Sequence, residues 1–561
     1  MSTAVATLLY VLALAPMYAV GETPPFDTVA VHGVILLLLV TGLRGGRRGP
    51  SEPRGVDRAG AVLGGAVVFL ALFFVAMAVR KWRHLGYGGE DVTYISQALY
   101  RTLRGEGVLA PLGRPSHLGT HFSPYLFLIL PVYALVPHAL TLIVIKVVAV
   151  ATSAIPLYRL AALGLPSASA LQLALAYLLS LPVVSQYLHE YYDLQFAPLL
   201  LLWTLFFLAR ERFLPFLTAA ALLSLLREEM GMLVALVGVL AGLRGQPRRF
   251  ALVPVVLGLS FSAGGYLVGI PFFSWKGAYD VALATGGAPP PASGHELVTA
   301  LATRENAQYL YLLGAPFAYV LPFLDPGALL ALPFIGGILL SPVVHVKSLT
   351  YHYSAFLVAA LFASVVSRIA RRRREGRGQA VDRTIPALLL ALSSAFAYPQ
   401  YLRGLPAEVS TPFKWPGSGS PRAYLEAADA ALRSLPRDAE VLVPRYMGPR
   451  VPPRPLLDFY WSYGRPSSLP RLDHPPAYIL IDDTSEDGFT RIWLNQAFLS
   501  SPECSSYRLL MEGEGLRLFA RRGMDAVESP KRSPSGQDGR SSRKQPTSVS
   551  NSADHGPPPC T

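Results

Sequence analysis

The chain has 561 residues, of which 52% are hydrophobic and 15% are charged, with a formal net charge of +13. Soluble globular chains carry about 25% charged residues, so this composition excludes a string of water-soluble domains. The basic residues fall mainly in short connections between apolar stretches, which argues for membrane orientation signals and against a nucleic-acid partner. The sequence therefore predicts an all-α polytopic membrane protein embedded in the lipid bilayer.

Apolar stretches of near-spanning length recur up to about residue 400 and predict about 13 transmembrane helices. The first 43 residues contain no Lys or Arg, so the first stretch is predicted to be a retained span and a cleaved signal is the alternative. The predicted spans are 3–20, 28–43, 59–79, 139–158, 168–186, 194–209, 213–227, 230–243, 250–270, 308–324, 327–343, 354–369 and 384–400.

The Arg-rich connections predict the orientation of these spans. Arg side chains concentrate in residues 44–58, 244–249 and 371–374, and such connections are expected in the cytoplasm. This places the N-terminus on the inner side of the cytoplasmic membrane, and residues 80–138, 187–193 and 271–307 on its outer side. The apolar segment 121–137 is broken by Pro124 and Pro131, so we expect an interfacial or re-entrant helix there on the outer side.

The composition changes after residue 400, where the transmembrane domain 1–400 is predicted to end. Residues 401–523 contain a helix-like stretch at 422–435 and β-like runs at 440–443, 477–481 and 516–520. They predict a small α/β domain, which the span count places outside the membrane. Residues 524–561 are rich in Ser, Pro, Lys and Arg and predict a disordered tail.

The outer loop 80–138 carries the first candidate site. In a helix, Glu90, Tyr94 and Gln97 share one face. A carboxylate such as Asp91 at a membrane boundary can accept a proton from a hydroxyl group, or hold a divalent cation against a phosphate. The alternative is a solvated loop whose acids pair with neighbouring basic residues, namely Arg80, Lys81, Arg83 or Arg101.

Three further polar clusters are predicted on the same outer side. They lie at 189–193, where Glu190 is the acid, at 227–229, and at 345–353. Ionisable groups within the membrane cost free energy and are therefore often functional. For the cluster 227–229 the alternative is a structural ion pair at the membrane interface, formed by Arg227 with Glu228 or Glu229. Lys347 is a candidate phosphate contact or a membrane anchor. Together the clusters predict an outward-facing cavity.

Several ordered motifs resemble an uncharacterised prokaryotic membrane family, the domain of unknown function 2079, over roughly residues 85–365. The motifs are 91–100 (DVTYISQALY), 119–124 (GTHFSP), 156–160 (PLYRL), 192–198 (YDLQFAP), 227–229 (REE) and 351–355 (YHYSA). Asp91 and His121 match the family pattern. Ser96 stands where members usually have a second acid, and Glu-Tyr-Tyr at 190–192 stands where they usually have Asp-Phe-His.

This family is similar to the C-type (GT-C) glycosyltransferases, which take sugars from polyprenyl-phosphate donors outside the cytoplasmic membrane. The resemblance implies a transferase in which Asp91 is the general base or, with Glu90 or Glu190, a ligand of Mg²⁺ or Mn²⁺. Arg227 or Lys347 would offset the charge of the donor phosphate. The other implied substrate-binding residues are Tyr94, Gln97, His121, Glu190, Tyr192, Glu229 and His352.

Two other functions stay open at the level of sequence. A transporter or lipid flippase would place charged residues near the middle of spans, or broken helices in two matching halves. We place the ionisable residues at span ends and find no matching halves, so this hypothesis ranks below the enzyme. The third is an envelope scaffold whose outer C-terminal domain binds a partner.

Overall fold

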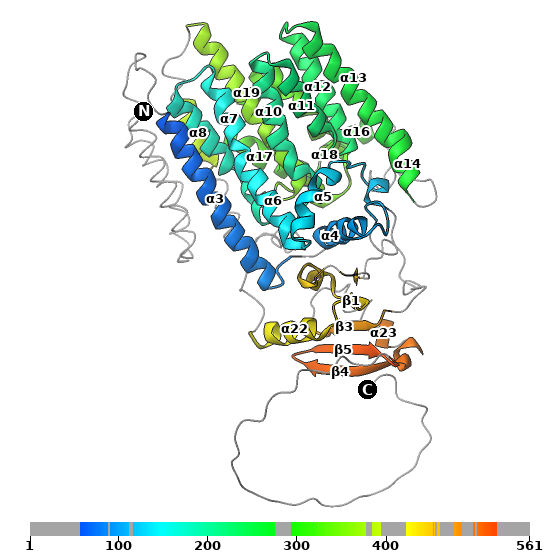
Figure 1. Ribbon diagram of the computed structural model, residues 1–561. Coiled ribbons are helices and arrows are strands. Elements are labelled where there is room, and N and C mark those ends of the chain that lie inside the picture. Colours follow the sequence, from blue (N-terminus) through cyan, green and yellow to red (C-terminus); the bar gives the residue numbers. More distant parts are fainter. Residues whose placement is uncertain are drawn as a thin grey trace, which may run out of the picture. The chain divides into compact units, whose positions relative to one another are not determined.

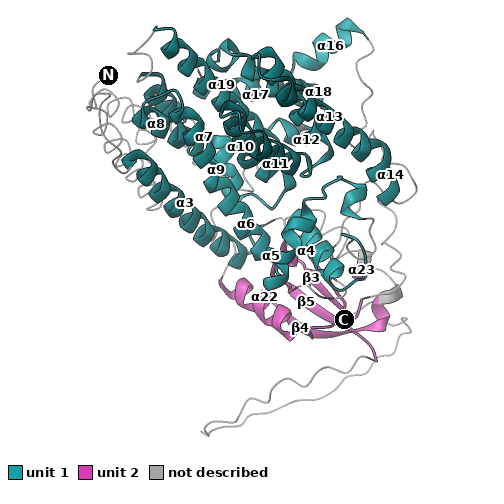
Figure 2. Ribbon diagram, turned by 45° about the horizontal axis from the view of Figure 1, so that its top comes forward, with its two compact units in different colours: residues 1–418 teal, residues 419–561 magenta. Residues whose placement is uncertain are grey.

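The computed structural model describes a set of ranges that covers most of the chain between residues 57 and 523. These are 57–87, 90–110, 116–274, 293–317, 319–376, 384–393, 422–452, 454, 457–459, 476–484, 497–499 and 502–523. The predicted spans 3–20 and 28–43 and the predicted tail 524–561 lie outside them. The first unit is helical (Figure 1), and the chain divides into compact units of residues 1–418 and 419–561 (Figure 2).

Four helices in the described part of the chain are long and apolar enough to cross a membrane. They match predicted spans 59–79, 139–158, 250–270 and 354–369. A fifth candidate is a pair bent by 54°, α8 (Ser167–Leu178) and α9 (Leu181–Leu188). The first of the four spanning helices is α3 (Arg58–Arg83), and the second consists of α6 (Ala139–Thr152) and α7 (Ala154–Ala162). The third runs from α13 (Arg248–Gly264) through a π-helix (Gly265–Gly269) to α14 (Ile270–Phe273). The fourth is His352–Arg374, which contains α19 (Ala355–Arg374).

The remaining helices of this unit are shorter. They are α4 (Glu90–Leu103), α5 (Leu126–Leu135), α10 (Ala197–Ala209), α11 (Phe213–Ser224), α12 (Glu228–Leu243), α16 (Gly294–Leu301), α17 (Arg304–Gly314), α18 (Leu332–Leu340) and Thr384–Ser393. The ten residues of α5 extend about 15 Å, which is too short to cross a core about 30 Å thick. Segment 121–137 is therefore not a full span.

The predicted spans 308–324 and 327–343 are not continuous helices. After α17 the chain makes three 3-10 segments, Ala315–Phe317, Leu321–Leu324 and Pro326–Leu330, before α18 begins. Pro316, Pro322 and Pro326 lie in these segments, and each lacks the N–H that an α-helix needs. Hydropathy alone did not reveal these breaks, and the total of about 13 spans is not confirmed.

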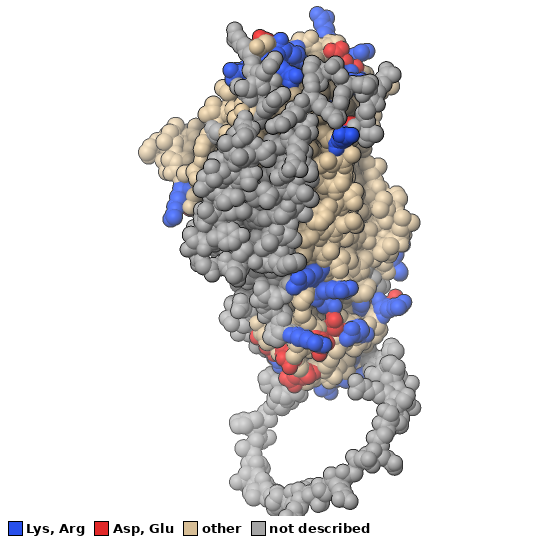
Figure 3. All heavy atoms as spheres, turned by 90° about the vertical axis from the view of Figure 1, so that its left-hand side faces the viewer, with Lys and Arg blue, Asp and Glu red and all other residues tan. Residues whose placement is uncertain are grey.

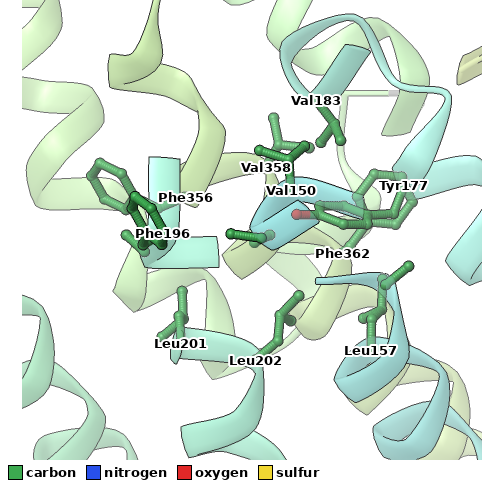
Figure 4. Packing of buried hydrophobic residues seen from close by; sticks show 14 of the residues in the cluster. Val150, Leu157, Tyr177, Val183, Phe196, Leu201, Leu202, Phe356, Val358 and Phe362 are labelled. Atoms are coloured by element: carbon green, nitrogen blue, oxygen red, sulfur yellow. The ribbon is translucent and has the colours of Figure 1, made fainter. Parts of the chain in front are cut away.

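The core of the first unit is one cluster of buried hydrophobic side chains from many of its helices. Figure 4 shows side chains from α6, α8, α10 and α19 meeting there, with the ring of Tyr177 edge-on to that of Phe362 at 5.7 Å. The Tyr177 hydroxyl also lies 2.9 Å from Ser153 Oγ. The buried hydroxyl of Tyr177 therefore has its hydrogen-bond partner inside the core, and this bond joins α8 to the residue that ends α6.

Connections that the Arg distribution assigns to the cytoplasm make contacts with one another. Asp325 is 2% exposed and pairs with Arg244 after α12, and with Arg371 in α19. Asp57 accepts a hydrogen bond of 2.7 Å from Tyr158 in α7. At the top of Figure 3, Lys and Arg side chains gather with some Asp and Glu above a broad surface of other residues, and further Lys and Arg side chains lie lower in this view. The assignment of sides stays a prediction.

The second unit is a small α/β structure with the sheet order β2-β1-β3-β5-β4. β1 pairs in parallel with β2 and β3, whereas β5 pairs antiparallel with β3 and β4. The predicted helix and three strands are confirmed, and β2 and β4 were not predicted. The elements are α22 (Arg422–Ser434), β1 (Val441–Val443), β2 (Leu457–Phe459), β3 (Tyr478–Asp482), α23 (Ala497–Leu499), β4 (Tyr507–Gly513) and β5 (Leu516–Arg521).

Candidate functional site

The start of α4 meets the connection between α9 and α10. The main-chain N–H of Asp91 donates to Oε2 of Glu190 at 3.2 Å, and a side-chain hydrogen bond joins Asp91 to Tyr192. The predicted helix is present, and it buries Val92 while Asp91 stays half-buried. Glu90 is the first residue of α4, and its side chain lies outside the described part. Asp91 thus adjoins two other predicted site residues, Glu190 and Tyr192, the nearer of which is 99 positions away in the sequence.

Asp193 ties the same connection to the segment before α5. Its carboxylate accepts hydrogen bonds of 2.7 Å from the hydroxyls of Ser123 and Tyr125, and it lies 3.0 Å from Nε2 of His117. The hydroxyl of Tyr125 also lies 2.7 Å from that of Tyr191. Sequence reasoning included Asp193 in the polar cluster 189–193 but gave it no role and did not select His117, because nothing local marks residues 76 positions apart as partners.

His121 meets the first turn of α12. Its Nδ1 lies 3.2 Å from Oε1 of Glu228, and the N–H of Phe122 donates to the other carboxylate oxygen at 2.7 Å. The Phe122 ring packs on Gly265 and Gly269 in the π-helix, where any Cβ on Gly269 would overlap the ring. This close approach lets the segment reach Glu228. π-turns of this kind frequently occur at functional sites.

Arg227 and Glu229 form the ion pair that the sequence left open. Arg227 Nε lies 3.0 Å from Oε1 of Glu229, so the acid of this motif that faces His121 is Glu228. Oε2 of Glu229 is buried and has no hydrogen-bond partner among the described residues. Arg227 also attracts Asp193 electrostatically. The ion pair therefore belongs to the polar cluster and is not isolated at its rim.

Two histidines and two tyrosines form another side of the cluster, two from the connection between α9 and α10 and two from the segment before α19. The rings of Tyr192 and His352 stack at 3.7 Å, and Tyr353 lies 4.0 Å from His352. His189 lies 5.1 Å from Tyr192 and 6.2 Å from His352. His189 and His352 are 5% and 2% exposed, and Nδ1 of each has no hydrogen-bond partner in the described part of the chain.

Burial controls the charge of the imidazoles outside the spans. It lowers the pKa of His189 well below its usual range, and the nearby ammonium groups of Lys81 and Lys146 lower that pKa further. Burial also lowers the pKa of His121, and the Arg227 guanidinium acts in the same direction. Both imidazoles are therefore neutral near pH 7, so each ring can donate one hydrogen bond and accept another.

The other predicted residues have different surroundings. Tyr94 lies with its ring 5.7 Å from that of His117, and Gln97 is buried in α4. Lys347 ends a 3-10 turn, where it is partly exposed and attracted to Glu305. The structure thus brings Tyr94 toward the pair formed by His117 and Asp193, whereas the charge partner of Lys347 belongs to α17.

The two residues of the predicted cation site, Asp91 and Glu190, meet through the main-chain N–H of Asp91 and the carboxylate of Glu190. Within the described ranges, no three His, Cys, Asp or Glu side chains come together in a group that could hold a metal ion. A divalent ion usually needs more protein ligands than two, or completes its shell with water and substrate oxygens. The requirement for Mg²⁺ or Mn²⁺ stays a prediction.

One charged residue lies where the sequence analysis expected none. Lys146 is in α6, inside the predicted span 139–158, and is 0% exposed. The expectation that ionisable residues occur only at span ends is therefore wrong for this helix. The signal was present, since an isolated lysine in an apolar run is a candidate functional group.

Comparison with known proteins gives a family and several structural neighbours, one of which is described below. A family model described as "Predicted membrane protein (DUF2079)" matches residues 82–518. No curated protein matches the chain. The crystal structure of ArnT from Cupriavidus metallidurans bound to undecaprenyl phosphate is similar with a TM-score of 0.46 and 12% identity, over 82% of this chain and 99% of that one. A similarity of this size carries no conclusion about activity.

Proposed function

From its membership of the DUF2079 family of predicted membrane proteins, we propose that this chain transfers a sugar from a polyprenyl-phosphate donor to an acceptor at the outer face of the cytoplasmic membrane. The donor and reaction come from the resemblance of the family motifs to GT-C glycosyltransferases. The support from this chain is a polar cluster at which four separate connections meet.

The observation that carries the proposal is a group of buried polar atoms that the described part of the chain leaves without hydrogen-bond partners. Nδ1 of His189, Nδ1 of His352 and Oε2 of Glu229 have no hydrogen-bond partner among the described residues. Buried polar groups normally have partners, because desolvating them without one costs about 1–3 kcal/mol each. Their concentration around Asp91 and Arg227 fits a site for a polar ligand with both donor and acceptor groups.

Each predicted residue has a role in this proposal. Asp91 is the general base that accepts a proton from the acceptor hydroxyl, or with Glu90 a cation ligand. His121, Glu190 and Glu229 form the polar wall, and Arg227 offsets the donor phosphate charge. The remaining binding residues are Tyr94, Gln97, Tyr192, Lys347 and His352. We assign no step to the divalent cation.

Asp91 provides the direct test. We expect Asp91→Asn to lower sugar transfer by about 100-fold or more in outward-facing membrane preparations given a polyprenyl-phosphate sugar, because a positioned base contributes about 10²–10⁴-fold. Glu106→Gln is the matched control, since this acid in the same loop pairs with Arg104 and lies outside the cluster. It should keep transfer within about twofold of wild type. Undiminished transfer by Asp91→Asn would contradict the proposal.

Transport is the second function to compare. The buried charge of Lys146 is a feature that transporters use, but its ammonium group donates three hydrogen bonds to main-chain carbonyls. It therefore has no hydrogen left for a moving solute. Lipid or solute flux without sugar transfer in the same vesicles would favour the transporter, and a phenotype caused only by deletion of residues 401–561 would favour a scaffold.

A further inference from the structure

The last three carbonyls of α9 and the carbonyl of His189, the residue that ends the helix, all accept hydrogen bonds from lysine side chains. The end of an α-helix leaves four carbonyls without partners inside the helix. Here two ammonium groups from other helices supply the donors. Nζ of Lys146 donates to the carbonyls of Gln186 (2.8 Å), Tyr187 (3.0 Å) and His189 (2.7 Å), and Nζ of Lys81 donates to the carbonyl of Leu188 (2.9 Å).

Both lysines come from long apolar helices that do not belong to the connection they hold. Lys81 is in the last turn of α3 and is 3% exposed, and Lys146 lies in the middle of α6. Cations are favourable at the C-terminus of a helix, where the helix dipole is negative. A buried lysine also needs a full set of acceptors. The carbonyls at the helix end therefore serve as acceptors for the buried ammonium groups, and the ammonium groups serve as donors for these carbonyls.

The residue after this helix end is the predicted site acid Glu190. Its carboxylate is attracted electrostatically to both Lys81 and Lys146. The same carboxylate accepts the hydrogen bond from the main chain of Asp91. Gln195 also holds the main chain of Glu190 in place, because its side-chain amide donates a hydrogen bond of 2.8 Å to the carbonyl of Glu190. The contacts thus run from the two lysines through the helix end to the start of α4.

We propose that Lys146 and Lys81 are positioning residues that cap α9 and thereby orient His189 and Glu190 within the site. The hydrogen bonds described above all end on main-chain carbonyls of the connection, so the two lysines act through it as positioning residues. The inference rests on the proposed function for the role of Glu190. Its test measures the connection itself and needs no turnover.

The test is hydrogen exchange of the full-length protein in lipid nanodiscs. Lys146→Met keeps the length of the side chain but removes all three donors, so amides in residues 186–193 should exchange about tenfold faster or more, with the rest of the chain within about twofold. Lys146→Gln retains two donor hydrogens and should fall between Lys146→Met and wild type. Ile145→Met, the neighbouring position in α6, is the control and should exchange as wild type does.

Lys81→Met gives a second, smaller change because it removes one hydrogen bond. Its effect should be confined to the amides nearest Leu188 and Glu190, with the melting temperature close to that of wild type. Wild-type protection of residues 186–193 in Lys146→Met would overturn the proposal. So would a uniform loss of protection over the whole chain in both variants, because that pattern indicates a general structural role. Absent sugar transfer with the expected exchange pattern would contradict only the proposed function.

Discussion

The guanidinium of Arg244 lies 2.6 Å from the carboxylate of Asp325, and Arg371 pairs with the other oxygen of that carboxylate at 3.2 Å. Arg244 follows α12, which begins at Glu228, and Arg371 lies in the last turn of the long helix that begins at His352. Asp325 therefore joins the far ends of two helices whose opposite ends contribute to the candidate site.

Removing this carboxylate should destabilise the protein strongly. We expect Asp325→Ala to lower the free energy of unfolding by about 3–5 kcal/mol, because two guanidinium groups lose their buried counterion. Asp483→Ala is the matched control, since Asp483 pairs with Arg517 at the surface, and it should cost about 1 kcal/mol or less. Thermal unfolding in detergent measures both. Equal losses would show that burial of the pair is unimportant.

A double-mutant cycle should identify the acid that His121 uses. His121→Ala combined with Glu228→Ala should show a coupling of about 0.5–3 kcal/mol, since the two side chains are in contact. The same cycle with Glu229→Ala should give a smaller coupling, because Glu229 pairs with Arg227. Stability to denaturant provides the measurement. A larger coupling with Glu229 would contradict the observed arrangement.

Asp193 should tolerate an amide better than truncation. Asp193→Ala removes the acceptor for three side chains and should cost about 3–5 kcal/mol of stability. Asp193→Asn retains one acceptor oxygen and should cost about 1–3 kcal/mol. Comparison of their melting temperatures checks the order. The reverse order would mean that the carboxylate does not organise this network.

The neutral state of His189 should make stability depend on pH. Its folded pKa is depressed below the ordinary value, so its contribution is present above about pH 6.5 and is lost as the pH falls toward the folded pKa. We expect the melting temperature of His189→Gln to fall less than that of wild type between pH 7.5 and pH 5.5. The difference corresponds to at most about 1.4 kcal/mol per pH unit. Parallel pH profiles would show that His189 does not titrate in this way.

The sequence predicted the long helices and the strands of the second unit better than it predicted the broken helices. Uninterrupted apolar runs such as 59–79 appear as α3, because their length and composition leave few other conformations in a bilayer. In 308–343 the apolar composition continues through Pro316, Pro322 and Pro326, so hydropathy predicts helix where the backbone makes 3-10 turns. The positions of these three prolines in the sequence indicated where the helix breaks.

For the candidate site, the sequence indicated which connections carry polar residues but not how these residues pair. Asp91 and Glu190 adjoin, yet Glu228 rather than its neighbour faces His121, because the helical position of one residue decides which acid points inward. The role of Asp193 depends on three donors from a distant segment. Such pairings arise only when helices pack, so a single sequence does not contain them.

The bend between α8 and α9 sets the depth of the polar connection that follows. Along the direction of α8, its 12 residues and the 8 residues of α9, tilted by 54°, advance about 25 Å, which is about 5 Å less than a hydrocarbon core. We therefore expect residues 189–193 to lie close to the edge of the hydrocarbon core, just below the lipid ester groups. There, dissolved oxygen should reach a spin label more readily than a water-soluble nickel chelate does. A molecule anchored by an acyl or prenyl tail would meet these residues without leaving its leaflet.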